Sequence, residues 1–378
     1  MTKKSLTIVL IEPYFTGSHA DWAQGYRRYS RHHIELLTLP GKFWKWRMHG
    51  GAISLAKAYQ QQRYKPDLIL STDMLDLTTF LACTRTQTHS IPTALYFHEN
   101  QLSYPWQAGD RDVQYQRDHH YGFINYASAV ASDLICFNSN YHYQSFIHEL
   151  ERFLNHFPDF RQKHRIEEIE QKSKTCYLGL DLDRLDAERV SPFSEPLVLW
   201  NHRWEYDKNA EEFFTALFQV ADMDIPFKVA VLGESFAQKP EPFMRAKQIL
   251  GDRIVQWGYI KEESEYIQWL WRAHVLPVTS IQDFFGASVV EGIYCNCYPL
   301  LPNRLSYPEL IPVQSCPQHF YNHRQELVQK LAMVLLDGQD IENCSLRHCV
   351  ERFNWKQMAV YYDDLFESLV NQRKRVPA

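Results

Sequence analysis

The stretch Pro277–Glu291 reads PVTSIQDFFGASVVE, and the rest of the chain can be interpreted around it. The apolar run Val275–Val278 predicts a short buried strand, and a helical pattern opens at Ser288 after a polar turn. Asp283 and Glu291 are eight residues apart. The first acid belongs to the predicted loop, and the second lies about two turns into the predicted helix.

This pattern is typical of a site that binds an anion. A helix start at Gly286–Val289 directs free backbone N–H groups and the positive end of the helix dipole at a ligand. Gly286 lets that ligand approach the backbone closely. Asp283 and Glu291 can accept hydrogen bonds from sugar hydroxyls, so a sugar-bearing diphosphate fits the stretch. An ordinary strand–loop–helix with solvated acids fits the same stretch.

Length and composition set the frame for the whole chain. Its 378 residues are enough for two domains, each with a substantial core. The net charge of −5 argues against a protein that coats nucleic acid through bulk charge, although a local basic patch remains possible. We expect no membrane insertion, since no apolar run approaches the roughly 20 residues that cross a bilayer.

The cysteines and the start of the chain indicate a cytoplasmic location. No signal-peptide core follows the first residues. The eight cysteines form no CxxC pair, so we expect reduced thiols. Cys295 and Cys297 are the closest pair, and their spacing is poor for zinc. No metal site is therefore predicted.

Short apolar runs alternate with longer amphipathic segments, which predicts an α/β fold with parallel sheets. A linker is expected at Arg189–Pro196. The predicted strands are Leu6–Ile11, Ile34–Leu39, Asp67–Ser71, Thr93–Phe97, Leu134–Asn138, Cys176–Asp181, Leu197–Trp200, Phe227–Gly233 (followed by Glu234 and Ser235), Ile254–Trp257, Val275–Val278 and Cys297–Leu301. The last amphipathic segment, Trp355–Val370, is a predicted helix that ends in basic residues.

Polar residues follow two strands of the first half. Gly17, Ser18 and His19 come after the first strand, where open α/β sheets bind ligands, but the motif is not GxGxxG. We expect them to line a sugar or acceptor site, although Ser18 or Asp21 could simply cap a helix that begins near Asp21.

The second such run follows the fourth strand. His98 could donate to a sugar hydroxyl or a developing oxyanion, and Glu99 could orient it or contact the acceptor. A single histidine is more often structural. Four consecutive polar residues, His98 to Gln101, nevertheless favour a functional site. Gln107–His120 is predicted to be a flexible loop nearby.

Two basic segments are candidates for nucleic-acid contact. Lys42–Arg47 (KFWKWR) interleaves cations with aromatics, which suits base stacking and phosphate neutralisation. The same pattern fits an amphipathic helix start packed on its own domain. The second segment contains Arg161, Lys163, His164 and Arg165.

Two cations follow the strand Leu197–Trp200. Arg203 is suited to bidentate binding and Lys208 acts as a point charge, so together they fit a diphosphate. A salt-bridged surface turn is the alternative.

Asp283–Glu291 also resembles the donor-site motif of retaining glycosyltransferases with the GT-B fold, which is an acid, Phe-Gly, and Glu after seven intervening residues. Asp283 stands where those enzymes usually have Glu. More widely, the chain resembles the glycosyltransferase-1-domain-containing family, whose characterised function is tRNA-queuosine α-mannosyltransferase. The segments that carry this resemblance are Glu12–His19, Thr38–Arg47, Ala94–Pro105, Phe137–Ser139, Gly179–Asp183, Leu199–Lys208, Val231–Ser235, Trp257–Tyr259 and Phe284–Leu310.

The resemblance implies GT-B architecture, with two Rossmann-like domains whose parallel sheets face each other across a cleft. The expected domains are residues 1–190 on the acceptor side and 191–354 for the nucleotide sugar, with a helix at 355–378 that crosses back to the first domain. The implied reaction transfers mannose from GDP-mannose to queuosine in a tRNA anticodon loop, with retention at the anomeric carbon. No cofactor or metal is implied.

The resemblance also implies roles for single residues. Arg203 and Lys208 would bind the diphosphate and stabilise the departing nucleotide. Asp283 would hold mannose hydroxyls, Glu291 the ribose, and His98 the sugar. The remaining donor-site candidates are Gly17, Phe285, Gly286, Ala287 and Ser288, and the acceptor candidates are Lys42, Trp44, Lys45, Trp46, Arg47, Glu99, Asn100 and Gln101.

Two other functions remain open at this point. One is a glycosyltransferase of the same fold with a lipid or polysaccharide acceptor. The other is a non-catalytic protein that binds tRNA or a nucleotide, for which Asp283 in place of Glu is the only hint. The sequence does not indicate an oligomeric state.

Overall fold

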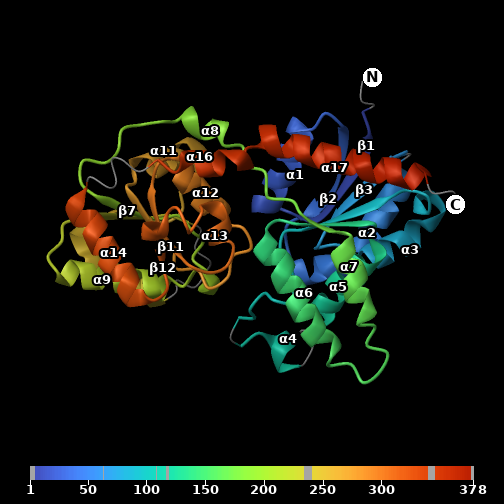
Figure 1. Cartoon of the computed structure of the whole chain (residues 1–378), viewed down its shortest axis with the longest axis horizontal. Helices are drawn as coiled ribbons and strands as arrows, with labels where there is room; N and C mark the ends of the chain where they lie inside the picture. Colours follow the sequence, from blue (N-terminus) through green and yellow to red (C-terminus); the bar gives the residue numbers. More distant parts are fainter. Residues whose placement is uncertain are drawn as a thin grey trace. The chain divides into compact units, whose positions relative to one another are not determined.

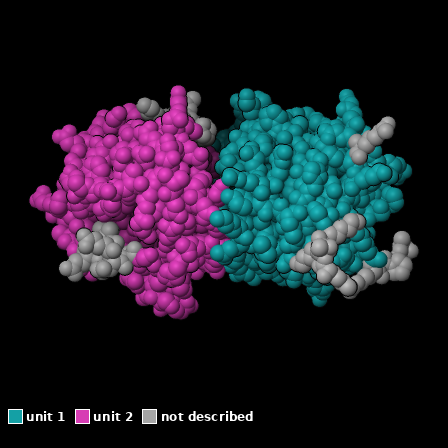
Figure 2. All heavy atoms as spheres, turned by 90° about the horizontal axis from the view of Figure 1, so that it is seen from above, with its two compact units in different colours: residues 1–180, 355–378 teal, residues 181–354 magenta. Residues whose placement is uncertain are grey.

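The structure, a computed structural model, describes residues 5–62, 64–107, 109–115, 119–233, 241–338 and 345–375. The chain divides into two compact units, coloured separately in Figure 2. Unit 1 contains Met1–Leu180 and Trp355–Ala378, and unit 2 contains Asp181–Asn354. Residues 181–190, which the sequence assigned to the N-terminal domain, thus belong to unit 2. The predicted continuation at Glu234 and Ser235 lies outside the described residues, as do parts of the predicted loop at 107–120.

Unit 1 is built on a six-stranded parallel sheet in the order β2-β1-β3-β4-β5-β6. Figure 1 labels β1, β2 and β3 of this sheet. The sequence prediction was wrong at two strand ends. β1 continues to Phe15, because Glu12 and Phe15 still pair with β2. The sixth strand lies before Cys176 rather than after it. The strands are β1 (Thr7–Phe15), β2 (His33–Pro40), β3 (Leu68–Thr72), β4 (Thr93–Phe97), β5 (Leu134–Phe137) and β6 (Ser173–Thr175).

Helices cover this sheet because its central strands are apolar on both faces. β3, β4 and β5 are buried along their whole length. One cluster packs α2 and α3 on β1 and β3, and another packs α6 on β4 and β5. The helices of unit 1 are α1 (Gly17–Tyr29), α2 (Trp44–Gln61), α3 (Leu77–Thr88), α4 (Arg111–Gln114), α5 (His119–Ala131), α6 (Asn140–Leu154), α7 (His164–Gln171) and α17 (Trp355–Arg375).

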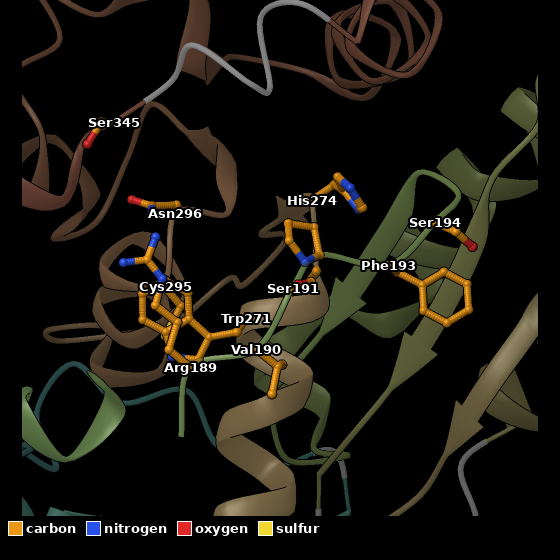
Figure 3. Close-up of a pocket in the computed structure, with 12 residues that line it drawn as sticks. Arg189, Val190, Ser191, Phe193, Ser194, Trp271, His274, Cys295, Asn296 and Ser345 are labelled. Carbon is orange, nitrogen blue, oxygen red and sulfur yellow. The ribbon is translucent and has the colours of Figure 1, made fainter. Parts of the chain in front are cut away.

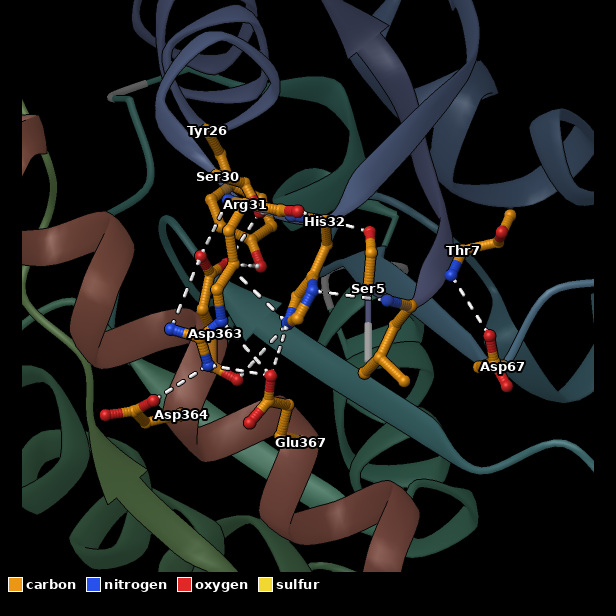
Figure 4. A network of polar contacts seen from close by, with 11 residues as sticks. Ser5, Thr7, Tyr26, Ser30, Arg31, His32, Asp67, Asp363, Asp364 and Glu367 are labelled. Atoms are coloured by element: carbon orange, nitrogen blue, oxygen red, sulfur yellow. Dashed lines mark hydrogen bonds and ion pairs between the residues drawn. The ribbon is translucent and has the colours of Figure 1, made fainter. Parts of the chain in front are cut away.

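The C-terminal helix α17 is anchored in unit 1 by a buried carboxylate (Figure 4). Asp363 accepts hydrogen bonds from the Tyr26 hydroxyl (2.8 Å), the Ser30 hydroxyl (2.6 Å) and the Arg31 backbone N–H (2.9 Å). The Arg31 guanidinium lies 2.7 Å from Asp364. These contacts join the last helix to α1 and to the turn that follows α1.

Unit 2 contains a second parallel sheet, in the order β12-β11-β10-β7-β8-β9. Its strands are β7 (Leu197–Trp200), β8 (Lys228–Val231), β9 (Ile254–Trp257), β10 (Val275–Pro277), β11 (Tyr298–Pro302) and β12 (Phe320–Tyr321). Its helices are α8 (Asp183–Asp186), the 3₁₀ turn η1 (Tyr206–Lys208), α9 (Ala210–Asp222), α10 (Glu241–Leu250), α11 (Glu263–Arg272), α12 (Ala287–Tyr294), α13 (Tyr307–Leu310), α14 (Arg324–Asp337) and α16 (Arg347–Val350), with further 3₁₀ turns η2 (Gly251–Arg253), η3 (Pro317–His319) and η4 (Glu351–Phe353).

The α/β prediction with two parallel sheets is confirmed. The two-residue strand β12 was not predicted, because so short a run carries no periodicity. Within the described ranges, no helix is both long enough and apolar enough to cross a membrane.

Candidate active site

The predicted donor-site residues meet at the switch point of the unit 2 sheet. The chain order reverses between β7 and β10, which are neighbours in the sheet. In open α/β sheets, ligands bind beyond the carboxyl ends of the strands at such a point. The loop after β7 carries Arg203 and Lys208, and the loop after β10 carries Asp283 and Gly286.

Lys208 and Asp283 form a largely buried ion pair across these two loops. Lys208 Nζ lies 3.3 Å from Asp283 Oδ2 and 3.1 Å from Asp207 Oδ2. Burial lowers the pKa of Lys208, but Asp283 and Asp207 outweigh burial and raise it. Burial raises the pKa of Asp283, but Lys208 outweighs burial and lowers it. Both side chains are therefore charged at neutral pH.

Gly286 forms the start of α12. Its φ of +94° is left-handed, and a Cβ there would lie 3.2 Å from the Tyr307 ring. A side chain would thus be strained and crowded. The first internal hydrogen bonds of the helix run from Val289 and Val290 to the Gly286 carbonyl. The N–H groups of Ala287 and Ser288 precede these bonds and are available to an anion.

The rest of this loop is held by hydrogen bonds. The Phe285 N–H donates to Asp283 Oδ1 (3.4 Å), and the Tyr307 hydroxyl donates to Asp283 Oδ2 (3.2 Å). The Phe285 ring is buried and packs against Phe353. Phe285 therefore supports the site from the core, and its side chain is not positioned to face a ligand.

His202 is a site residue that the sequence interpretation missed. Its Nδ1 lies 3.0 Å from the Ser288 hydroxyl, and Asn201 Nδ2 donates to the Ser288 carbonyl (2.7 Å). These contacts attach the start of α12 to the loop after β7. Burial, with a further effect from Lys208, lowers the pKa of His202 to about 3, so the imidazole is neutral. Its place directly before Arg203, just after a predicted strand, was the available signal.

Arg203 lies at the exposed side of the same loop. Its side chain is 57% exposed and contacts Glu205 at 3.1 Å. The guanidinium is close enough to Lys208 to oppose the raised pKa of that lysine. The site thus has one buried cation and one exposed cation near it.

Glu291 is already engaged by two partners that the sequence did not indicate. Its Oε1 accepts from the Arg184 guanidinium, and its Oε2 accepts from the Tyr266 hydroxyl at 3.1 Å. A carboxylate oxygen can accept more than one hydrogen bond. Glu291 can therefore still bind a hydroxyl, but in an orientation that Arg184 and Tyr266 set.

The unit 1 candidates lie at the carboxyl edge of the other sheet. His98 is buried directly after β4, and burial and then His19 lower its pKa well below the usual value. Gly17 has a φ of +48° and open space at its Cβ. It belongs to the first turn of α1, which begins four residues before the predicted start at Asp21.

Asn100, an acceptor candidate, uses its side chain within its own turn. Asn100 is fully buried, and its Oδ1 accepts from the backbone N–H groups of Leu102 (3.1 Å) and Ser103 (2.9 Å). It therefore shapes a turn. Gln101 Nε2 donates to Glu99 (2.9 Å), so these two partly exposed side chains hold each other.

The basic segment 42–47 divides into an inward and an outward part. Trp44 packs against Tyr121 and Trp106, with ring centroids 5.1 and 6.3 Å away, and Lys45 lies 2.7 Å from Asp110. Both side chains thus contact other residues of their own unit and are only partly exposed. Lys42 and Trp46 remain exposed, and Arg47 donates to the Pro40 carbonyl (3.0 Å).

The second basic segment is largely neutralised by its own helices. Lys163 lies 3.3 Å from Glu151, and Arg165 lies 2.5 Å from Glu168. Arg161 donates to the Phe157 carbonyl (2.8 Å). The expected cluster of free positive charge is therefore weaker than its sequence suggests.

A cavity of about 880 Å³ lies at a different place in unit 2 (Figure 3). It is next to His274, at the amino end of β10, and shares no residue with the switch-point loops. Its position at the opposite edge of the sheet separates it from the diphosphate candidates. The lining residues are Arg189, Val190, Ser191, Pro192, Phe193, Ser194, Trp271, Ala273, His274, Cys295, Asn296 and Ser345.

Among the described residues, one group has the composition of a metal site. The ligand atoms of Glu12, His19 and His98 lie within 4.8 Å of one another. His19 Nδ1 already contacts Glu12, at 3.0 Å. The sequence did not predict this cluster, since its members come from separate elements.

Solved structures identify the class of protein that this fold defines. Sucrose-phosphate synthase from Thermosynechococcus elongatus is 17% identical with a TM-score of 0.68, over 97% of this chain and all of that one. A glycosyltransferase from Rickettsia africae is 15% identical with a TM-score of 0.67, over 97% of this chain and 99% of that one. The two-sheet architecture is the GT-B fold of glycosyltransferases, as predicted.

Sequence comparison identifies the family within this class. Residues 7–180 match the family model described as tRNA-queuosine alpha-mannosyltransferase N-terminal. The tRNA-queuosine alpha-mannosyltransferase of Drosophila melanogaster is 32% identical over 377 residues, which is 95% of this chain and 96% of the relative. The chain belongs to the tRNA-queuosine alpha-mannosyltransferase family and is a hexosyltransferase.

Proposed function

We propose that this protein transfers mannose from GDP-mannose to a hydroxyl of queuosine in a tRNA anticodon loop, with retention at the anomeric carbon. The acceptor and the sugar rest on the similarity to the Drosophila enzyme along nearly the whole chain. The observation that supports transfer from a sugar diphosphate is the charged Lys208–Asp283 pair beside the start of α12.

The donor diphosphate is assigned to the switch-point loops of unit 2. Lys208 and Arg203 neutralise the phosphates, and the N–H groups of Ala287 and Ser288 donate to their oxygens. As the glycosidic bond breaks, negative charge grows on the departing nucleotide. Groups fixed in place before the reaction stabilise this charge without reorganising.

Asp283 and Glu291 are assigned to hydroxyls of the donor. Asp283 is ionised, so it accepts hydrogen bonds from mannose hydroxyls, and Glu291 accepts from the ribose. We assign no side chain as nucleophile or general base, because the departing phosphate can take the proton of the acceptor hydroxyl. Two cations at the diphosphate make a metal unnecessary in this scheme.

The tRNA is assigned to the exposed residues at the start of α2. Phe43 and Trp46 are 77% and 63% exposed. Phe43 also has a left-handed φ of +56°, which is costly for a large side chain, and such strained residues cluster at functional sites. Exposed aromatic rings stack on unpaired bases, and Lys42 beside them neutralises phosphate.

The experiment incubates the full-length protein with queuosine-containing tRNA and a panel of sugar nucleotides, and then weighs the released nucleosides. The proposal predicts a hexose added to queuosine with GDP-mannose, and no addition to tRNA that lacks queuosine. Equal transfer to a lipid or polysaccharide acceptor would contradict it.

A further inference from the structure

His202 and Ser288 connect the two loops of the candidate donor site. His202 follows β7, and Ser288 is the second residue of α12. His202 Nδ1 lies 3.0 Å from the Ser288 hydroxyl oxygen. Asn201 Nδ2 donates to the Ser288 carbonyl at 2.7 Å, so Ser288 is held by both its side chain and its backbone. The proton between His202 and Ser288 can come from either residue, and the two choices give Ser288 different chemistry.

The contacts of His202 fix its backbone and its ring. The residue is buried, with 3% exposure, and its ring meets the Trp200 indole nearly at a right angle, with centroids 5.3 Å apart. The Trp200 Nε1–H donates to the His202 carbonyl at 2.9 Å. Gly233 packs closely on the same carbonyl, since a Cβ there would lie 2.0 Å from its oxygen. The Nδ1 atom of His202 therefore stays directed at Ser288.

The position of the imidazole proton decides what Ser288 can do. Burial, and then Lys208, lowers the pKa of His202 to about 3, so only one ring nitrogen carries a proton at neutral pH. Nε2 is buried and has no hydrogen-bond partner in the part of the chain that the structure describes. A proton on Nε2 would be a buried donor without an acceptor, which is rarer in proteins than an unsatisfied acceptor. This difference favours the proton on Nδ1, facing Ser288.

With the proton on Nδ1, the Ser288 hydroxyl becomes a donor. It accepts from His202 and keeps its own proton for another acceptor. The side chain is half-buried, and its hydroxyl makes no second hydrogen bond to any residue within the described ranges. The Ser288 N–H precedes the first internal hydrogen bonds of α12, which start at Val289. Two donors of one residue can therefore bind oxygens of the same phosphate.

We propose that His202 donates Nδ1–H to Ser288 and thereby directs the proton of the Ser288 hydroxyl to a phosphate oxygen of the nucleotide sugar. This inference rests on the proposed function, which assigns the diphosphate to these loops. His202 does not touch the ligand and is a positioning residue. A neutral imidazole suits this role, because it donates to Ser288 without adding a charge next to Lys208. As negative charge grows on the departing nucleotide, the oriented hydroxyl stabilises it without reorganising.

The protonated nitrogen of His202 is measured in the wild type by ¹⁵N NMR of the full-length protein labelled at histidine. Two other histidines of unit 2 are internal references. His319 Nδ1 lies 3.0 Å from the Pro299 carbonyl, which can only accept, so His319 is protonated at Nδ1. His274 Nδ1 accepts from the Leu197 N–H at 3.1 Å, so His274 is protonated at Nε2. We expect the Nδ1 signal of His202 to match that of His319, and a match to His274 would overturn the proposal.

Calorimetry with GDP and with guanosine measures what the Ser288 hydroxyl contributes. We expect His202→Leu and Ser288→Ala each to raise the Kd for GDP about tenfold, as for one hydrogen bond to a charged group. The Kd for guanosine, which carries no phosphate, should change less than about twofold. If His202 acts through Ser288, the double variant binds GDP no more weakly than Ser288→Ala alone. Losses that add in the double variant, or an equal loss of guanosine affinity, would overturn the proposal.

Two further variants separate the donated hydrogen bond from a general effect on folding. In His202→Asn, the amide nitrogen can take the place of Nδ1, so we expect a Kd for GDP within about threefold of wild type. His274→Asn is the matched control, since His274 lies at the amino end of β10, and it should leave the Kd for GDP unchanged. An asparagine at 202 that binds GDP as weakly as the leucine would contradict the role of the donor.

These measurements use neither tRNA nor mannose, so they are independent of transfer to queuosine. Lys208→Ala separates the inference from the proposed donor site. A GDP affinity that falls in Lys208→Ala but not in Ser288→Ala would overturn the inference and leave the diphosphate assignment in place. A protein that shows the expected His202 signals and GDP affinities but transfers no mannose to tRNA would contradict the proposed function alone.

Discussion

At the scale of single residues, the account depends on Lys208 and Asp283. The two residues are far apart in the sequence, but Lys208 Nζ lies 3.3 Å from Asp283 Oδ2. Lys208 and Asp283 follow different strands, and each strand alone predicts only a polar turn. Their meeting follows from the adjacency of β7 and β10 in the sheet. Burial disfavours the charged form of both side chains, and the attraction between them keeps both charged.

Lys208→Ala removes the buried cation of the donor site. We expect a loss of about 2–4 kcal/mol of transition-state stabilisation, because charge on the departing nucleotide is no longer neutralised. Steady-state kcat/KM for mannose transfer measures this loss. Lys228→Ala is the control, since Lys228 pairs loosely with Glu195 (3.8 Å) elsewhere in unit 2. Equal activity of Lys208→Ala and wild type would remove the diphosphate assignment.

The Glu12–His19 pair predicts how stability changes with pH. Since the folded pKa of His19 is raised to about 9 from 6.5, the pair stabilises the protein fully below pH 6.5. This contribution is lost as the pH rises through about 9. Denaturant unfolding of wild type and His19→Gln should therefore differ most near pH 6 and converge above pH 9. A difference that grows with pH would show that His19 is not held in its charged form.

At the scale of elements, the start of α2 contains both residues that pack against unit 1 and residues that are exposed. Lys45 is fixed between Asp110 and Asp112, and Trp44 is packed, whereas Lys42 and Trp46 face solvent. A pattern of alternating cations and aromatics could not show this division, because the partners of Lys45 lie more than sixty residues away.

Trp46→Ala should weaken tRNA binding by about 1–3 kcal/mol, the usual contribution of stacking one base. Lys42→Ala should reduce the slope of log affinity against log salt by nearly one, since one phosphate contact is lost. Filter binding across a salt series measures both effects. For Lys45→Ala we expect an unchanged salt slope, and a slope reduced as much as in Lys42→Ala would contradict the division of this segment.

The hydrogen bonds that anchor α17 lead to a prediction about the stability of the protein. Asp363→Ala leaves the Tyr26 and Ser30 hydroxyls and the Arg31 N–H without their shared acceptor. We expect a loss of about 3 kcal/mol in the free energy of unfolding, from several unsatisfied buried donors. Chemical denaturation measures it. Asp364→Ala is the exposed control, and equal stability of the two variants would show that the buried network contributes little.

At the scale of the whole molecule, the sequence predicted the fold class well and the site in part. Buried parallel strands are continuous apolar runs, so most strands were predicted within a few residues of their observed ends. The loops after β7 and β10 were predicted because polar residues directly follow strands. His202, Arg184, Tyr266 and Tyr307 were missed, because their roles depend on contacts between distant elements.

The same limit explains the acceptor residues. Asn100 is polar and follows a strand, as a site residue should, yet its amide closes a turn. Asp73 accepts from the backbone N–H of His98, and nothing near it in the sequence indicates this contact. The spacing of residues along the chain indicates local geometry. Which strand ends are neighbours can be known only from the fold.

The central claim is that the loops after β7 and β10 bind the diphosphate of the donor. The most direct measurement is a crystal structure of the full-length protein with GDP. The account predicts phosphate oxygens within hydrogen-bond distance of Lys208 Nζ and of the N–H groups that open α12. Phosphates bound at any other part of the protein, with the Lys208–Asp283 pair untouched, would contradict it.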